Sequence, residues 1–283
     1  RRAAALASKN ARQVKAKSLA LWFPGVDQRP GEILRAMGEG ALLALYRFDK
    51  YVTKTANEST KIQTISFCSD IRTVASAAAR ALEQAQIIAE ATITARNLAN
   101  APGNEIYPET LAEKARDLGT QFGFDVTALE EPELRNLGMG GVLGVAQGSS
   151  RPPRFIILEY GKSSVRPVVL VGKGVTFDSG GISIKPSANM AEMKMDMSGA
   201  AAVIGTFEAV ARLKLPVRIV GLIPAVENMP SGSSLRPGDI LRHYNGKTSE
   251  VDNTDAEGRL ILADALGYAE RYKPAAVIDL ATL

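Results

Sequence analysis

The segment that decides the fold is residues 168–181, which read VVLVGKGVTFDSGG. Its first four residues form an uninterrupted apolar run, which predicts a strand buried on both faces near the centre of a sheet. Gly172 and Gly174 then flank Lys173, and Asp178 precedes Ser179 and a second pair of glycines. A lysine and a carboxylate at the end of a central strand predict a ligand site at that edge of the sheet.

Short apolar runs alternate with helical patterns on both sides of this segment. Such alternation predicts an α/β fold with a largely parallel or mixed central sheet that helices cover on both faces. The expected strands are residues 19–23, 63–68, 125–129, 155–160, 168–171, 217–223 and 275–280. The expected helices are residues 32–45, 74–98, 108–118, 132–137, 200–213 and 260–272.

The alanine-rich helical stretch 74–98 ends before Pro102-Gly103, a pattern typical of a domain connector. We expect residues 1–75 to form one domain, residues 76–100 a connecting helix, and residues 101–283 a larger second domain. The chain does not begin with methionine, and it ends at Leu283, inside or just past a strand that we expect to be buried. We therefore expect a fragment, with the first domain incomplete at its start and the second truncated at its end.

The formal charge of +4 is unevenly spread along the 283 residues. Residues 1–18 contain no acid and carry Arg1, Arg2, Lys9, Arg12, Lys15 and Lys17, so the rest of the chain is net negative. Such a stretch can bind nucleic acid or an anionic membrane, but a solvated helix face is the interpretation we favour. No apolar run approaches the roughly 20 residues of a membrane span, so we expect no membrane-spanning segment.

The chain contains one cysteine and one histidine. Cys68 cannot form an intrachain disulfide, and its neighbours Ile65 and Phe67 lead us to expect a buried, unreactive thiol in a reducing compartment, the cytoplasm. His243 lies where a strand leads into a turn, without an accompanying nucleophile motif, so we expect a surface role. A single histidine also argues against a His-Glu-x-x-His zinc site.

Two lysines are candidates for a reactive site. Lys173 can act as a metal ligand if burial or a nearby cation lowers the pKa of its amine. The alternative is a phosphate-binding lysine in a glycine-rich loop, although no Gly-Lys-Ser/Thr follows. Lys185 projects from a loop made rigid by Pro186 and can return to the same site as an electrophile, whereas alone it would be an exposed surface lysine.

Carboxylates supply the remaining chemistry. Asp196 precedes a helix, where the alternative is an acid that interacts with the helix dipole while Ser198 caps the helix. Residues 253–260 read NTDAEGRL, and in an irregular segment Asp255, Glu257 and Arg259 can all face one cavity. Oxygen ligands suit hard divalent cations, and two metals about 4 Å apart take bridging carboxylates. The sequence therefore predicts a two-metal hydrolytic site.

Residues 171–186, 193–199 and 253–260 resemble the signature segments of the leucyl aminopeptidase family, cytosolic exopeptidases with a dinuclear metal centre. The segment NTDAEGRL is highly specific to that family. The resemblance runs from about Ala79 to the end of the chain, is thinner over residues 1–75, and includes no substituted motif position. It implies an N-terminal α/β domain remnant, a connecting helix, and a catalytic domain with a mixed central sheet covered by helices.

The resemblance also implies the roles of individual residues. One metal would be held by Lys173, Asp178, Asp196 and Glu257. The other would be held by Asp178, Asp255 (side chain and backbone carbonyl) and Glu257, so that Asp178 and Glu257 bridge. Lys185 and Arg259 would form the catalytic pair, with a bicarbonate ion at Arg259 as general base. The positions that would lie beside the substrate are Asn253, Met193, Thr282 and Leu283.

The implied activity is the release of N-terminal amino acids, leucine-like residues preferred, from peptide substrates. The cofactors would be two divalent ions per subunit, Mn²⁺ or Zn²⁺ with Mg²⁺ or Co²⁺ as alternatives, in a cytoplasmic homo-hexamer. Another two-metal hydrolase, acting on amides or phosphoesters, stays open. So does an aminopeptidase with a secondary DNA-binding role, which the basic residues 1–18 permit but no helix-turn-helix or aromatic stacking motif supports.

Overall fold

The chain forms two compact units, Arg1–Ile93 and Thr94–Leu283, and the division falls within one long helix, α3 (Ala75–Asn100). The computed structural model describes residues 1–22, 29–53, 61–69 and 75–282. Residues 23 and 74, each the end of a predicted element, lie outside this set. Within the described part, no helix is long and apolar enough to cross a membrane.

The first unit contains a two-stranded parallel sheet, formed by β1 (Ser18–Trp22) and β2 (Thr64–Cys68). Helices α1 (Arg2–Gln13) and α2 (Pro30–Leu45) contribute Ala4 and Ala41 to a small core that also contains Leu21. Lys9 and Arg2 of α1 are exposed. These two side chains lie on a solvated face of the helix, whereas Arg12 is half-buried.

Cys68 corrects one of our expectations, because its side chain is exposed rather than buried. Successive side chains of a strand point to opposite faces. In β2, Ile65 and Phe67 pack against the core, so Cys68 points away from it. Apolar sequence neighbours therefore do not bury this thiol.

The second unit is built on a mixed sheet with the strand order β10-β5-β7-β4-β3. Strand β4 is antiparallel to both of its neighbours, whereas β5 is parallel to both β7 and β10. The prediction of a mixed α/β sheet is confirmed. The strands are β3 (Asp125–Leu129), β4 (Arg154–Tyr160), β5 (Val168–Gly172), β7 (Ile219–Asn228) and β10 (Ala276–Leu280).

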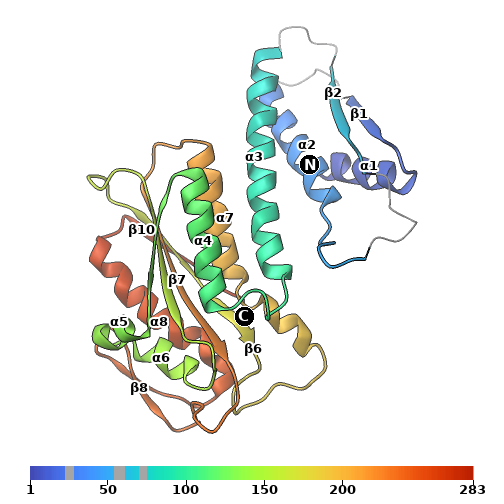
Figure 1. The fold of residues 1–283 in the computed structure, drawn as a ribbon. Coiled ribbons are helices and arrows are strands. Elements are labelled where there is room, and N and C mark those ends of the chain that lie inside the picture. The colour runs from blue at the N-terminus through green and yellow to red at the C-terminus, as the bar shows by residue number, and fades with distance from the viewer. Residues whose placement is uncertain (23–28, 54–60, 70–74, 283) are drawn as a thin grey trace. The chain divides into compact units, whose positions relative to one another are not determined.

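Helices cover both faces of this sheet (Figure 1). The helices α4 (Pro108–Phe122) and α7 (Ser198–Arg212) lie on one face, and α6 (Gly140–Ala146) and α8 (Glu257–Ala269) on the other. The short helix α5 (Glu131–Leu137) packs beside α6. Alternate side chains of β4 pack on opposite faces of the sheet. On one face Phe155 lies edge-on to Tyr268 of α8, with ring centroids 5.1 Å apart, and on the other Leu158 faces α7.

The central strand predicted at residues 168–171 is β5, which lies between β7 and β10. A second strand that the sequence pattern did not predict, β6 (Gly174–Asp178), follows it after one residue. Strand β6 also pairs with β7, further along the same strand. Lys173 therefore sits at the break between two strands that share one partner.

Strand β10 corrects the expectation of a buried strand at residues 275–280. It lies at the edge of the sheet, paired only with β5 among the described strands, and its side chains from Ala276 to Asp279 are exposed. An apolar composition indicates a strand, but the position of that strand in the sheet decides its burial.

His243 corrects another expectation, because it is buried and not at the surface. It follows β8 (Ile240–Arg242), whose antiparallel partner is β9 (Thr248–Glu250). Its Nε2 lies 2.7 Å from Ser249 Oγ of β9, and its Nδ1 lies 3.3 Å from Asp264 Oδ1 of α8. Asp264 is fully buried, and it also accepts hydrogen bonds from the backbone N–H groups of Val142 and Tyr244. This network connects the hairpin to α6 and α8.

We expect Asp264→Asn to lower the free energy of unfolding by about 1–3 kcal/mol. The carboxamide has one acceptor oxygen, so one of the two backbone N–H donors would face an amide NH₂ in the interior. Urea denaturation measures the change, with Ser249→Ala as the matched control because it removes a single hydrogen bond at the half-buried end of the same network. Equal losses in the two variants would contradict this account of Asp264.

Candidate metal centre

Lys173 is directed into the centre by the break between β5 and β6. Its backbone N–H donates to the Leu280 carbonyl (2.9 Å), and its carbonyl accepts from the Ala200 N–H at the start of α7 (2.9 Å). Its ammonium lies 2.8 Å from Asp196 Oδ2 and 2.9 Å from Glu257 Oε1. The buried Lys173 ammonium thereby joins Asp196, just before α7, to Glu257 at the start of α8.

Gly258, on α8, leaves room for this lysine. A Cβ atom at position 258 would lie 2.7 Å from Lys173 Cε and 2.9 Å from its Nζ. Gly258 lies within the first turn of α8. The lack of a Cβ atom at Gly258 therefore lets the Lys173 side chain lie close to α8.

Asp178 ends β6 and is buried beside Lys185. The Lys185 ammonium lies 2.9 Å from Asp178 Oδ2 and 2.5 Å from Asp255 Oδ1. Gly180 has the positive φ of +87° that glycine adopts without strain, and its N–H donates to Asp178 Oδ1 (2.9 Å). The loop after β6 thus returns Lys185 to the carboxylate, as the spacing of the two residues predicted.

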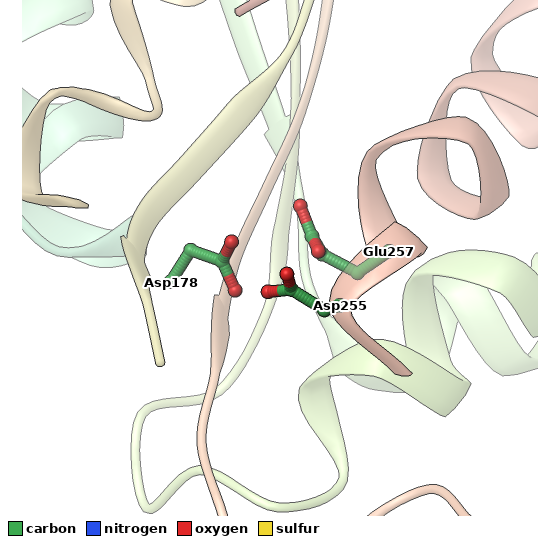
Figure 2. Close-up of side chains that lie close together, drawn as sticks. All are labelled: Asp178, Asp255 and Glu257. Atoms are coloured by element: carbon green, nitrogen blue, oxygen red, sulfur yellow. The ribbon is translucent and has the colours of Figure 1, made fainter. Parts of the chain in front are cut away.

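The 3₁₀ turn Thr254–Ala256 brings the other two acids to Asp178. Asn253 caps this turn, because its side chain accepts a hydrogen bond from the Asp255 N–H (2.8 Å). Asp255 is half-buried and Glu257 is 1% exposed. Figure 2 shows the three carboxyl groups facing one another, and one oxygen from each lies within 4.8 Å of the others.

Asp196 joins the centre through Lys173 and does not cap a helix. The Thr282 hydroxyl donates to Asp196 Oδ1 (2.5 Å), opposite the contact with Lys173. Ser198 does not cap α7 either, because its hydroxyl donates to the Met195 carbonyl. The alternative in which Ser198 caps the helix is therefore wrong.

The remaining predicted residues differ in where they lie. Arg259 lies inside α8, about 200° around the axis from Glu257, and its side chain is exposed while Glu257 is buried. The prediction of an irregular segment is therefore correct for Asp255, which lies in the 3₁₀ turn, and wrong for Arg259, which lies in a regular helix. Met193 is half-buried in the 3₁₀ segment Met190–Met195. Leu283 lies outside the described residues.

The centre contains more acidic than basic side chains, and the pKa values of several of these groups are raised. Burial and the neighbouring Asp178 raise the pKa of Glu257 to about 7, and burial also raises the pKa of Asp196. Burial opposes the charged form of Lys173, but Glu257 and Asp196 outweigh it and raise the pKa of this lysine.

Two residues of the centre were missed by sequence reasoning, Asn228 and Thr254. The Asn228 amide donates to Asp178 Oδ1 (2.8 Å) and to the Thr254 carbonyl (2.9 Å). The Thr254 hydroxyl donates to the Gly180 carbonyl (2.7 Å). A signal for Asn228 was present, since the apolar run of β7 ends in the polar residues Glu227 and Asn228, as β6 ends in Asp178.

These residues fit divalent cations. Four carboxylates converge on two ammonium groups, so the cluster retains a net negative charge, and burial raises the pKa of Glu257 and Asp196. Carboxylate oxygens and a lysine amine are donors that such ions accept. An α/β sheet that gathers these groups where β6 ends is typical of metal-dependent hydrolases.

Comparison with known proteins identifies the family. The catalytic domain of the cytosol aminopeptidase family matches residues 93–283, and the N-terminal domain of the same family matches residues 1–55. The chain belongs to the cytosol aminopeptidase family. This confirms the resemblance drawn from the three signature segments.

Curated relatives are named probable cytosol aminopeptidases. One from Roseiflexus castenholzii is 47% identical over 287 residues, covering 100% of this chain and 59% of the relative. Another, from Syntrophotalea carbinolica, is 50% identical over 274 residues, covering 96% of this chain and 55% of the relative. The chain thus spans somewhat more than half the length of these relatives.

Solved structures give the same fold. The bottromycin maturation enzyme BotP in complex with Mn has a TM-score of 0.84 at 39% identity, covering 99% of this chain and 61% of that one. Cytosol aminopeptidase from Coxiella burnetii has a TM-score of 0.79 at 34% identity, covering 93% of this chain and 55% of that one.

Proposed function

We propose that the protein is a metal-dependent aminopeptidase that releases N-terminal residues, leucine-like ones preferred, from peptides. The observation that carries the proposal is the convergence of Asp178, Asp255 and Glu257 within 4.8 Å, in a member of this family. The proposed partners are peptide substrates and, as a homo-hexamer, further copies of the chain in the cytoplasm. The Mn in the related BotP structure supports a divalent cofactor.

The proposed ligands are Lys173, Asp178, Asp196 and Glu257 for one ion, and Asp178, Asp255 and Glu257 for the other. Two such ions would supply Lewis acidity, which polarises a scissile carbonyl and makes water a nucleophile at neutral pH. The ions would be Mn²⁺ or Zn²⁺, with Mg²⁺ or Co²⁺ as alternatives. Thr282 supports this assignment, since its hydrogen bond orients Asp196.

Lys185 and Arg259 are the proposed catalytic pair. Lys185 has a raised pKa because its hydrogen bonds to Asp255 and Asp178 outweigh the effect of burial, so it is cationic at neutral pH and can stabilise an oxyanion. An arginine cannot act as a base, because its pKa exceeds about 12. The exposed guanidinium of Arg259 would instead hold a bicarbonate ion, which would supply a general base for the attacking water.

The proposal is tested with the protein expressed from its complete coding sequence. We expect it to hydrolyse leucine-p-nitroanilide after incubation with Mn²⁺ or Zn²⁺, and not to hydrolyse p-nitrophenyl phosphate. Hydrolysis of the phosphoester in place of the anilide would favour the alternative two-metal hydrolase. Asn253 and Met193 are proposed to lie beside the substrate, together with Thr282 and Leu283.

Metal affinity should fall as pH is lowered through about 7, because protonated Glu257 must lose its proton to the solvent before its carboxylate can bind a cation. Mn²⁺ titrations by calorimetry at pH 8, 7 and 6, in buffers of different ionisation enthalpy, measure both affinity and proton release. The raised pKa has the opposite consequence for the metal-free fold: between about pH 4.5 and 7 the folded state binds more protons than the unfolded state, so stability falls as pH rises. A pH-independent affinity would contradict this prediction.

A further inference from the structure

Asn228 is the last residue of β7 and is 4% exposed. The sheet register places it opposite Asp178 of β6. Its carbonyl accepts two hydrogen bonds from Ser179, one from the N–H (3.0 Å) and one from the hydroxyl (2.7 Å). The backbone of Asn228 is therefore fixed at the strand end, and its side chain points into the metal centre.

The Asn228 amide connects two separate segments of that centre. Its Nδ2 lies 2.8 Å from Asp178 Oδ1, 2.9 Å from the Thr254 carbonyl and 3.5 Å from Glu257 Oε2. A carboxamide nitrogen has two N–H donors, so the two shorter contacts use both. Each of these partners is an acceptor, which fixes the nitrogen end of the amide toward them.

The two connected segments carry three of the proposed ligands. Asp178 ends β6, whereas Thr254 begins the 3₁₀ turn that presents Asp255 and leads into Glu257. The ion pairs of the centre depend on the charges of Lys173 and Lys185, but Asn228 is neutral. It holds Asp178 Oδ1 without altering the charge of the cluster, whereas the other oxygen, Oδ2, lies 2.9 Å from the Lys185 ammonium.

We propose that Asn228 is a positioning residue for the metal centre: it sets the orientation of the Asp178 carboxylate and its separation from the Asp255–Glu257 segment. This inference rests on the proposed function, since it assumes that these carboxylates hold cations. Loss of a group that orients metal ligands typically costs about 10–100-fold in metal affinity. The alternative is that the buried Asn228 amide contributes only to the stability of the fold.

The test compares Asn228→Leu with Thr176→Val by Mn²⁺ calorimetry and by urea denaturation in EDTA. Both variants remove buried hydrogen bonds of the β6–β7 pair, but the Thr176 hydroxyl donates only to the Val226 carbonyl. We expect the Mn²⁺ Kd to rise about 10–100-fold in Asn228→Leu and to stay unchanged in Thr176→Val, although both are less stable. If Asn228→Leu does not fold, Asn228→Ser, with one donor hydroxyl, takes its place with the same expected direction.

The outcomes separate the two proposals. Unchanged Mn²⁺ affinity in the Asn228 variant, or equal weakening in both variants, overturns the positioning role alone. Absence of Mn²⁺ binding by the wild-type protein overturns the metal-dependent function and this inference with it.

Discussion

Replacement of Glu257 by alanine should empty both metal sites, because this carboxylate is a proposed ligand of both ions. Glu257 is buried at the start of α8, 2.9 Å from Lys173, and one of its oxygens lies within 4.8 Å of an oxygen of Asp178 and of Asp255. Asp178→Ala should have the same effect. Asp196→Ala should weaken mainly one site, because Asp196 is a proposed ligand of one ion and contacts Lys173 and Thr282 beside it. Metal content per chain, measured by inductively coupled plasma mass spectrometry, distinguishes these results.

Glu250→Ala is the matched control for this prediction. It removes a carboxylate from the exposed strand β9 and should leave the metal content at the wild-type value. Full occupancy in Glu257→Ala would refute the bridging assignment. Loss of both ions in Asp196→Ala would show that the two sites are not divided as proposed.

The second large effect is expected for Lys185→Ala, which should lower kcat by roughly 10²–10³-fold, the range for loss of one oxyanion donor. The metal content should stay at the wild-type value, because Lys185 is not a proposed metal ligand. Its ammonium pairs with the Asp178 and Asp255 carboxylates. Leucine-p-nitroanilide kinetics on the protein expressed from its complete coding sequence measure the effect. KM should change less than kcat, since the donor acts on charge that develops in the transition state.

Lys162→Ala, an exposed lysine in the loop between β4 and β5, is the control and should retain wild-type kcat. A Lys185→Ala variant with kcat close to wild type would remove this lysine from the mechanism. A variant that loses both metal and activity would instead assign Lys185 to the architecture of the site.

Most helices and strands were predictable from local periodicity. The strand Asp125–Leu129 was predicted with its observed bounds, and the helix predicted at residues 108–118 begins at Pro108 as expected and continues to Phe122. These elements follow the apolar repeat of neighbouring residues, which is a property of the chain itself. Their ends moved by a few residues because caps and neighbouring elements set them.

Elements rich in glycine or very short were missed. Helix α6 begins Gly140-Gly141, where no apolar helical repeat is visible, yet α6 packs closely against the backbone of α8. Strand β6 begins at Gly174, directly after Lys173, and was not predicted, but β7 pairs with it on both sides of an irregularity between Val175 and Phe177. Packing and pairing decide such segments, because their own propensity is weak.

The sequence by itself determined the family, the α/β class and the acidic and basic residues of the candidate centre, because its signature segments hold these residues at short, recognisable spacings. Only the tertiary structure decided that Arg259 is exposed in α8 while Glu257 is buried, that His243 is buried beside Asp264, and that Asn228 meets Asp178. Asn228 and Asp178 are 50 positions apart, and the register of β6 against β7 places them opposite each other. Such meetings depend on how distant strands pair and pack, which no local pattern of residues encodes.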